Sequence, residues 1–528
     1  MQLLSQIIEE TSQRQPHKEA FRCRDRSLTY EILNEKSSGL AALLQGHGIG
    51  VGDRVAIYMP KAVEMAIGVY GCLKAGAIYV PVDPGLPTPR LASVLRDAGV
   101  SAVLTLDRQQ KQLMEVLPEL DLELQVIVGL PTLNENSIAT VPWESLPASS
   151  DYQSPSLTEN HPAYIIYTSG STGNPKGILH SHRSGLAYAR LAAETYQVNS
   201  GDRLGNFAPL HFDQSTFEFF SGPLAGSTTV LIPEEYMRFP ASLAKLIDDE
   251  QLTIWYSVPF ALVQLLLRGA LESRDLSSLR WVLFGGEPFP VGHLQKLMKR
   301  LSSATFSNVY GPAEVNQCTY FHLSQPPGDD VSSIPIGQIW PETSGMIVDA
   351  ACQPVPPGEL GELLISSPTM MTGYWNRPVL TDAAIVELPQ DGEVRKFYRT
   401  GDLVRESTDG NLEFHGRSDR QVKIRGNRVE LDEIELAILP LSGIEHVAAF
   451  ATSDPSSDEL HVVVFAIVSD DDLLDTSRIL LESRKRLPAY AVPSAIVIVD
   501  SFPQTTSNKT DYVAMERQYR ETVVDDLS

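Results

Sequence analysis

The chain has 528 residues, of which 43% are hydrophobic, and a formal net charge of -24. This length exceeds the usual size of one compact domain, so we expect two or more domains. The acidic balance argues against nucleic acid or an anionic membrane as the main partner, because both favour an excess of Lys and Arg.

The four cysteines, Cys23, Cys72, Cys318 and Cys352, are scattered and form no CxxC pair. We therefore expect neither a zinc site nor a disulfide framework, and we favour a reducing cytosol. The first twenty residues lack the basic start and sustained apolar core of a signal peptide, and no run approaches the roughly 20 apolar residues that span a bilayer. These features predict a cytoplasmic protein without a membrane partner.

The N-terminal part predicts helices followed by alternating strands and helices. Residues 1–20 and 28–47 predict amphipathic helices; the second places apolar residues at helical spacing at Ile32, Leu33, Leu40, Leu43 and Leu44. A helix from Pro60 to Leu73, capped by Gly76, follows the first strand. The predicted strands are 55–58, 79–82, 102–106, 126–128 and 163–166. Such alternation predicts a parallel sheet with helices on its faces.

The stretch YTSGSTGNPKG, Tyr167 to Gly177, directly follows the strand at 163–166. Its glycines let the backbone turn sharply and approach a ligand closely, and its N–H groups can form a concavity that holds an anion. Hydroxyls and a lysine add further donors for phosphate oxygens. Pro175 stands where a Walker loop has glycine, so the stretch predicts a phosphate-binding loop of another kind.

Beyond this loop, strand-like runs at 229–232, 253–257 and 281–284 are each followed by a helical segment and predict a second α/β lobe. After Asp349, short strands and turns predict a smaller β-rich subdomain. A final α+β unit begins near Asp419. Its predicted elements are a helix at 431–439, a strand at 461–468, a helix at 477–486 and a strand at 495–499, before a lysine-bearing tail.

With these blocks placed, the sequence resembles the adenylate-forming superfamily, and within it the amino-acid adenylation domains that charge carrier proteins. The motifs occur in the expected order. They are LTYEILNEKS (28–37), LKAGAIYVPVDP (73–84), the phosphate loop, HFDQS (211–215), NVYGPAE (308–314), GELLIS (361–366), YRTGD (398–402), GRSDRQVKIRGNRVELDEIE (416–435) and a terminal Lys509. The resemblance implies an α/β fold class: a large domain, 1–418, with two α/β lobes and a β-rich subdomain, and a small mobile α+β domain, 419–528.

The resemblance also implies that ATP and Mg²⁺ bind at matching positions. Activation of a carboxylate by ATP brings two negative groups together, so we expect catalysis by positioning and electrostatic neutralisation. Glu314 is the expected Mg²⁺ ligand, Asp402 the ribose acceptor and Lys509 the mobile cation that bridges carboxylate and α-phosphate. The remaining nucleotide-binding residues are Thr168, Ser169, Gly170, Ser171, Thr172, Gly173 and Lys176 in the loop, with Gly285, Gly286, Glu287, Tyr310, Gly311 and Arg417.

Two positions depart from the superfamily motifs, and a third matches its hinge. Ala313 replaces a threonine, which removes a hydroxyl contact to phosphate and should weaken nucleotide positioning by about 1 kcal/mol. Asn508 replaces a glycine beside Lys509. Asp419 matches the hinge between the two domains.

By the resemblance, Asp213 matches the residue that pairs with the α-ammonium of an amino-acid substrate. A buried carboxylate without a partner is costly, so we expect it to pair with that cation. The other pocket positions implied by the resemblance are Gln214, Phe217, Tyr256, Leu283, Gly285, Val309, Gln317 and Cys318. Their apolar and aromatic walls favour a small side chain. The segment NVYGPAEVNQCTY (308–320) resembles stand-alone ligases that load L-proline onto a carrier protein.

The resemblance therefore implies adenylation of a small amino acid, with L-proline the first choice, and release of pyrophosphate. Transfer to the phosphopantetheine thiol of a separate carrier protein would follow, as in nonribosomal peptide and secondary-metabolite biosynthesis. An acyl- or aryl-CoA ligase and a D-alanine-carrier protein ligase are the alternatives, and coenzyme A is the alternative thiol. We interpret His180, His182 and His211 as packing or gating residues.

Overall fold

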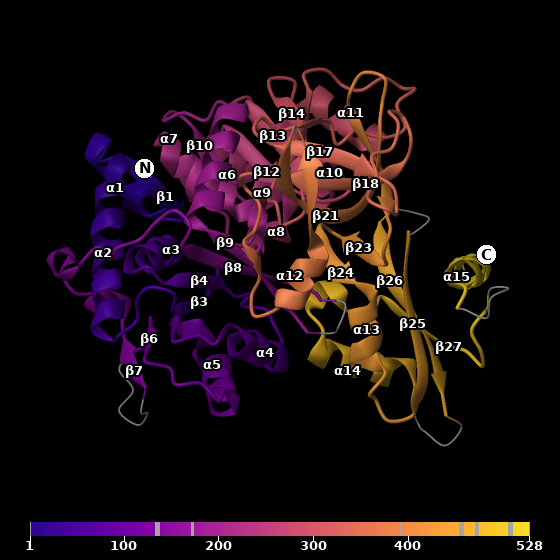
Figure 1. Cartoon of the computed structure of the whole chain (residues 1–528), viewed down its shortest axis with the longest axis horizontal. Helices are drawn as coiled ribbons and strands as arrows, with labels where there is room; N and C mark the ends of the chain where they lie inside the picture. Colours follow the sequence, from indigo (N-terminus) through magenta and orange to yellow (C-terminus); the bar gives the residue numbers. More distant parts are fainter. Residues whose placement is uncertain are drawn as a thin grey trace. The chain divides into compact units, whose positions relative to one another are not determined.

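A computed structural model describes residues 2–131, 138–170, 174–390, 392–453, 459–469, 475–504 and 510–526 (Figure 1). The chain forms two compact units. The larger unit contains residues 1–84, 94–167 and 177–418. The smaller unit contains residues 85–93, 168–176 and 419–528.

The larger unit contains two α/β sheets, as predicted. The first has nine strands in the order β16-β15-β14-β13-β12-β10-β11-β1-β2 and is parallel from β14 to β1. Its strands are β1 (Glu19–Cys23), β2 (Arg26–Thr29), β10 (Arg203–Asn206), β11 (Thr228–Leu231), β12 (Ile254–Ser257), β13 (Trp281–Gly285), β14 (Thr305–Tyr310), β15 (Thr319–Leu323) and β16 (Gln338–Ile339). Strands β11 and β12 are buried at every position, as expected for parallel strands covered on both faces.

The second sheet has eight strands in the order β19-β9-β8-β4-β3-β5-β6-β7 (Figure 1). They are β3 (Arg54–Tyr58), β4 (Ile78–Pro81), β5 (Ala102–Thr105), β6 (Val126–Val128), β7 (Ala139–Val141), β8 (Pro162–Thr168), β9 (Lys176–Ser181) and β19 (Gly373–Tyr374). The sequence suggested that the strands before the loop form one sheet and the strands after it the other, but several strands belong to the opposite sheet. Strands β1 and β2 join the later sheet, and β9, which lies beyond the loop, joins the earlier one.

The helices of the larger unit lie before or between its strands. They are α1 (Gln6–Arg14), α2 (Tyr30–Gly46), α3 (Val63–Ala75), α4 (Thr88–Ala98, which begins in the smaller unit), α5 (Gln110–Val116), α6 (His182–Thr195), α7 (Gly222–Ala225), α8 (Glu234–Met237), α9 (Pro240–Asp249), α10 (Pro259–Arg268), α11 (Val291–Arg300) and α12 (Pro378–Ala384). Helix α2 begins where Thr29 accepts a hydrogen bond from the backbone of Ile32. Gly76 ends α3 with a φ of 81°, which confirms the predicted cap.

Several predicted bounds were wrong. The first helix ends at Arg14 because residues 19–23 pair as a strand with β2 and β11. The helix predicted from Pro60 begins at Val63. Ile32, predicted on the apolar face of α2, is 40% exposed, because its neighbours Leu33, Leu40 and Leu44 occupy the buried face.

A third, antiparallel sheet forms the predicted β-rich region, although it begins at Ser344 rather than after Asp349. Its strands are β17 (Ser344–Val348), β18 (Gly361–Ser366), β20 (Ile385–Gln390), β21 (Glu393–Glu406) and β22 (Leu412–Arg417). Between Asp402 and Val404 the pairing of β21 with β22 shifts register. Such irregularities redirect side chains, and this one carries Asp402.

The smaller unit is an α+β structure. Its elements are the hairpin β23 (Gln421–Ile424) and β24 (Asn427–Glu430), helix α13 (Leu431–Ile438), the sheet β25 (Ile444–Ser453), β26 (Leu460–Val468) and β27 (Ala495–Ile498), and helices α14 (Thr476–Arg486) and α15 (Tyr512–Asp526). Residues of α13 and α14 share one apolar core with the sheet, whereas Met515 of α15 packs in a second core with Phe450 and Phe465. The sequence prediction missed the hairpin β23–β24, strand β25 and helix α15.

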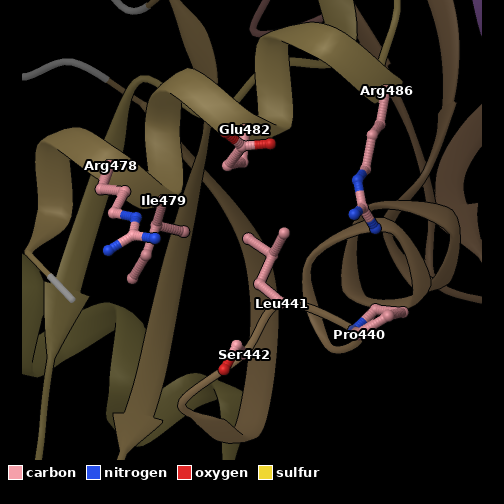
Figure 2. A pocket seen from close by; sticks show the side chains of 7 residues that line it. All are labelled: Pro440, Leu441, Ser442, Arg478, Ile479, Glu482 and Arg486. Atoms are coloured by element: carbon pink, nitrogen blue, oxygen red, sulfur yellow. The ribbon is translucent and has the colours of Figure 1, made fainter. Parts of the chain in front are cut away.

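A small pocket lies between the end of α13 and α14 in the smaller unit (Figure 2). Its lining residues are Pro440, Leu441, Ser442, Arg478, Ile479, Glu482 and Arg486. None of these was predicted as a site residue. Among the helices of the described ranges, none has the length and apolar character needed to cross a membrane.

Candidate active site

Three predicted nucleotide-binding side chains meet at Asp402. Asp402 and Arg417 lie opposite each other on β21 and β22, with Nη1 of Arg417 2.5 Å from Oδ1 of Asp402. The hydroxyl of Tyr310, at the end of β14, donates a hydrogen bond to Oδ2. Burial raises the pKa of Tyr310 well above its usual value, so its hydroxyl is a neutral donor. This carboxylate is held in one orientation, which suits an acceptor for the hydroxyl groups of a ligand.

The predicted glycines near this carboxylate sit where no side chain fits. A Cβ on Gly285 would lie 2.1 Å from a backbone oxygen, and one on Gly311 would lie 1.8 Å from another. Gly286 has a φ of 95°, which glycine adopts without strain. The adjacent Glu287 accepts a hydrogen bond from the backbone of Phe260 at 2.8 Å, so it anchors the start of α10.

Glu314 is completely buried and its Oε1 accepts a hydrogen bond from the hydroxyl of Tyr374 at 2.8 Å. Among the described residues, no group of three or more His, Cys, Asp or Glu side chains could hold a metal. One oriented carboxylate nevertheless fits Mg²⁺, which proteins often bind through one or two carboxylates together with substrate phosphates. The donor at this position therefore matches the metal that the family resemblance implies.

The described part of the phosphate loop leaves β8 at Thr168 and enters β9 at Lys176. A Cβ on Gly170 would lie 2.2 Å from the backbone oxygen of Asn174, so the turn requires glycine. Ser169 donates a hydrogen bond to the backbone oxygen of Arg428 within the smaller unit. The buried hydroxyl of Thr168 has no hydrogen-bond partner among the described residues, which leaves it available to a ligand oxygen. Ser171, Thr172 and Gly173 lie outside the described residues.

Four predicted pocket residues belong to a single apolar cluster in the larger unit. They are Phe217, Tyr256, Leu283 and Val309. The cluster also contains Tyr196 and Trp340, which the sequence did not indicate. The rings of Phe217 and Tyr256 pack edge to face with centroids 6.0 Å apart. The structure thus brings together the predicted apolar walls, from strands β12, β13 and β14 and the segment after Asp213.

Asp213 begins a single 3-10 turn, Asp213–Ser215, and a π-helical turn, Phe217–Ser221, follows it. Local π turns occur frequently at functional sites. Burial is the main cause of the raised pKa of Tyr256, and the nearby Tyr196 and Asp213 add to it. Asp213 thus stands in the turn that leads into Phe217 of the apolar cluster, and its carboxylate suits an ammonium group of a ligand.

Polar atoms also border this cluster. Gln317 is 2% exposed; its amide donates to the hydroxyl of Tyr196, while its Oε1 has no hydrogen-bond partner among the described residues. The amide nitrogen of Gln214 likewise has none within those ranges. Cys318 is buried, with its thiol 3.6 Å from the backbone oxygen of Tyr310. A ligand side chain beside Gln317 could therefore meet a buried acceptor.

Two predicted residues belong to the C-terminal part. Lys509 lies outside the described residues, as does its neighbour Asn508. Asp419 is the first residue of the C-terminal segment of the smaller unit, and its carboxylate accepts a hydrogen bond from the backbone of Gln421 at 3.2 Å.

The histidines have structural surroundings. His180 is buried between the hydroxyl of Ser184 and the backbone oxygen of Ala313, and burial lowers its pKa to about 4. Burial also lowers the pKa of His182 to about 4. Both side chains are therefore neutral near pH 7, which agrees with the interpretation as packing residues. Sequence reasoning missed Tyr374, whose only signal is its place in the GYWNR segment downstream of Glu314.

These features define an enzyme of the adenylate-forming class. The sequence matches the AMP-binding enzyme family over residues 8–375 and the C-terminal domain of AMP-binding enzymes over residues 433–509. The chain belongs to the AMP-binding enzyme family, and it is an ATP-dependent, AMP-forming ligase that uses Mg²⁺. The predicted superfamily and fold class are confirmed.

Relatives share both the sequence and the fold. An L-proline–[L-prolyl-carrier protein] ligase of Pseudomonas fluorescens is 33% identical, over 98% of this chain and 99% of the relative. A dimodular nonribosomal peptide synthase of Bacillus subtilis is 34% identical over 97% of this chain, which spans only 21% of that synthase. The adenylation domain AlmE of Vibrio cholerae, solved with glycyl-adenosine-5'-phosphate, is 26% identical, with a TM-score of 0.83 over 98% of each chain.

Proposed function

We propose that this enzyme activates a small amino acid, with L-proline the first choice, as its aminoacyl-AMP and releases pyrophosphate. One observation carries the proposal: the turn that begins at Asp213 leads directly into Phe217, which packs in a compact cluster with Tyr256, Leu283 and Val309. A carboxylate beside an apolar wall suits an α-ammonium group attached to a short apolar side chain. The near full-length similarity to a proline-activating ligase supports the choice of L-proline.

In the second half-reaction, the amino acid would pass to the phosphopantetheine thiol of a separate carrier protein. The P. fluorescens relative is named for such a transfer. Three of the four cysteines are buried, which agrees with a reducing compartment, and we infer the cytoplasm.

We assign the site residues by the role that their chemistry allows. Asp402, oriented by Tyr310 and Arg417, would accept hydrogen bonds from ribose, and Glu314 would bind Mg²⁺. The loop from Thr168 to Lys176 would hold phosphate oxygens. Lys509 would neutralise the attacking carboxylate and the α-phosphate. With the metal bound, its charge would offset the negative charge of the phosphates.

We keep the division into a large domain, 1–418, and a small mobile domain, 419–528, with Asp419 as the hinge. Asp419 lies where the chain passes from the larger compact unit to the smaller one, which supports this boundary. Rotation of the small domain would bring Lys509 to the substrate for adenylation and remove it for thiol transfer.

ATP–pyrophosphate exchange across a panel of amino acids and simple carboxylic acids tests the proposal. We expect the strongest exchange with L-proline and background exchange with acetate, benzoate and fatty acids. Exchange with an acid that lacks an α-amine would contradict amino-acid activation and support an acyl- or aryl-CoA ligase. Preference for D-alanine, L-alanine or serine would contradict only the choice of proline. Mass spectrometry of a phosphopantetheinylated carrier protein, with coenzyme A in a parallel reaction, identifies the thiol acceptor.

A further inference from the structure

The segment after Met370 touches both the buried carboxylate Glu314 and the exit of the phosphate loop. The backbone nitrogen of Met371 donates to the backbone oxygen of Glu314 at 2.7 Å. Three residues later, the hydroxyl of Tyr374 donates to Oε1 of the Glu314 side chain at 2.8 Å. Tyr374 is 6% exposed and Glu314 is fully buried, so water does not compete for this hydrogen bond.

The same segment continues as β19, which pairs with β9 at the exit of the loop. Tyr374 lies opposite Ile178, and the backbone nitrogen of Trp375 donates to the oxygen of Gly177 at 2.8 Å. Gly177 leaves no room for a side chain here. A Cβ on it would lie 2.6 Å from Cγ2 of Ile165, and it would also crowd the ring of Tyr167 at 3.1 Å and Trp375 at 3.3 Å.

The entrance of the loop is tied to the same place through Asp97. The hydroxyl of Tyr167, the residue before Thr168, donates to Oδ2 of Asp97 at 2.7 Å. Arg377 pairs with Oδ1 of Asp97, and the indole of Trp375 donates to its backbone oxygen at 3.2 Å. Burial and the hydrogen bond to Asp97 raise the pKa of Tyr167, so this hydroxyl is a neutral donor. Both ends of the loop therefore converge on Trp375 and Asp97.

We propose that Tyr374 and Asp97 are positioning residues, which together fix the Glu314 carboxylate relative to the two ends of the phosphate loop. This inference rests on the proposed roles of Glu314 and the loop. Mg²⁺ requires a narrow coordination geometry, so a small rotation of its carboxylate ligand weakens binding. Replacement of a residue that orients a ligand typically costs about 10–100-fold in metal affinity or activity. Asp97 would act on the loop, and hence on nucleotide affinity, rather than on the metal.

Two conservative variants separate these contributions. In Tyr374→Phe, we expect the Mg²⁺ concentration for half-maximal pyrophosphate exchange to rise about 10-fold, while KM for the amino acid stays unchanged. In Asp97→Asn, the acceptor for Tyr167 remains but the ion pair with Arg377 is lost. We expect KM for ATP to rise about 3–10-fold, with the wild-type Mg²⁺ dependence. Tyr58→Phe is the matched control, because Tyr58 is a buried tyrosine that donates to Gln112 at 2.6 Å.

A binding measurement provides a readout without turnover. Isothermal titration with a non-hydrolysable ATP analogue gives Kd with and without Mg²⁺. We expect Tyr374→Phe to reduce the gain in affinity that Mg²⁺ provides, and Asp97→Asn to weaken binding equally in both conditions. Wild-type values for both variants would overturn the inference. If none of the amino acids supports pyrophosphate exchange by the wild-type enzyme, the proposed function fails. The titration with the ATP analogue still tests the positioning roles in that case.

Discussion

Tyr310 and Arg417 bind opposite oxygens of the Asp402 carboxylate, one from β14 and the other from β22. The three residues come from parts of the sequence up to 107 residues apart, and two sheets meet where they lie. Because both donors lie on paired strands of these sheets, the carboxylate is oriented before any ligand arrives. Preorganisation of this kind lowers the cost of binding.

Variants of this group should act mainly on nucleotide affinity. Tyr310→Phe removes one neutral hydrogen bond and should raise KM for ATP about 2–10-fold. Asp402→Ala also removes the proposed ribose acceptor and leaves Arg417 without its carboxylate, so we expect an increase of about 10–100-fold. Steady-state exchange kinetics at saturating amino acid measure both effects. An unchanged KM for ATP in Asp402→Ala would contradict the nucleotide role of this carboxylate.

Much of the fold could be predicted, because many strands and helices are indicated by their own residues without knowledge of their tertiary neighbours. The alternation from β3 to β6 and the Gly76 cap are examples. The pairing of β1 with β11 could not be predicted, because the two strands lie about 200 residues apart and nothing local specifies a sheet partner. Helix α15 was missed because charged residues interrupt its apolar ones, so the sequence shows no clear apolar face.

The candidate site, like the fold, could be predicted only in part. Asp402, Glu314 and Asp213 stand in motifs and were predicted from the sequence. The residues that hold Glu314 and the ends of the phosphate loop were not predicted, because Tyr374 and Asp97 carry no signal for the side chains that they contact in the fold. The hydrogen bond of Gln317 to Tyr196 spans 121 residues and is visible only in the structure. Motifs thus indicate the groups that act on a ligand, whereas tertiary structure shows what holds those groups in place.

Lys509→Ala should reduce adenylation about 10²–10³-fold, the scale of one lost electrostatic contact in a transition state. Transfer of the amino acid from preformed adenylate to the thiol should suffer much less. Single-turnover assays measure the two half-reactions separately. Lys485→Ala is the matched control, because Lys485 is an exposed lysine of the same unit and pairs with Glu482. Equal losses in both half-reactions of Lys509→Ala would refute the assigned role.

Asp419→Pro should retain adenylate formation and impair thiol transfer, because proline removes the backbone freedom that a hinge requires. Asp419→Ala keeps that freedom and removes only the side chain that accepts from Gln421, so it serves as the control. We expect transfer to be slow in the proline variant and near wild type in the alanine variant. Normal rates for both steps in Asp419→Pro would show that rotation about this residue is not required.

Asp213→Ala should reduce exchange with amino acids by at least about 30-fold, because a buried ammonium without its carboxylate costs about 2–5 kcal/mol. Asp275→Ala, at an exposed position, is the control. Full activity of Asp213→Ala with L-proline would contradict the α-ammonium role.

Gln317→Leu tests the polar border of the pocket. If the substrate is L-proline, whose ring offers no side-chain hydrogen bond, we expect KM for L-proline to change less than about 3-fold. Loss of the hydrogen bond to Tyr196 should mainly lower the free energy of unfolding, by about 1 kcal/mol. A large and selective loss of exchange with an amino acid that carries a hydroxyl or amide would identify a polar substrate instead. The exchange panel, repeated with this variant, measures the difference.

Glu218 gives the clearest pH prediction. It is 1% exposed; Oε2 accepts from Asn206 at 3.0 Å, and Oε1 has no hydrogen-bond partner among the described residues. Burial raises its pKa from 4.5 to about 8, so the native side chain is protonated at pH 7. Between pH 4.5 and 8 the unfolded chain has released this proton while the native chain still holds it. Stability therefore declines as pH rises through this window, by up to about 1.4 kcal/mol per pH unit.

Glu218→Gln keeps a neutral side chain of the same shape and removes this dependence. The free energy of unfolding of the variant relative to wild type should therefore rise by about 2–3 kcal/mol from pH 5 to pH 7.5, measured by urea denaturation. Buried His180 and His182 lower the free energy of unfolding as pH falls below 6.5. This effect is the same in both proteins, so it cancels in the difference between them. Burial lowers the pKa of Lys61 to about 8, so this lysine contributes only above the window. Exposed Glu272→Gln should show a constant difference, and the same constancy in Glu218→Gln would show that Glu218 is ionised in the native enzyme.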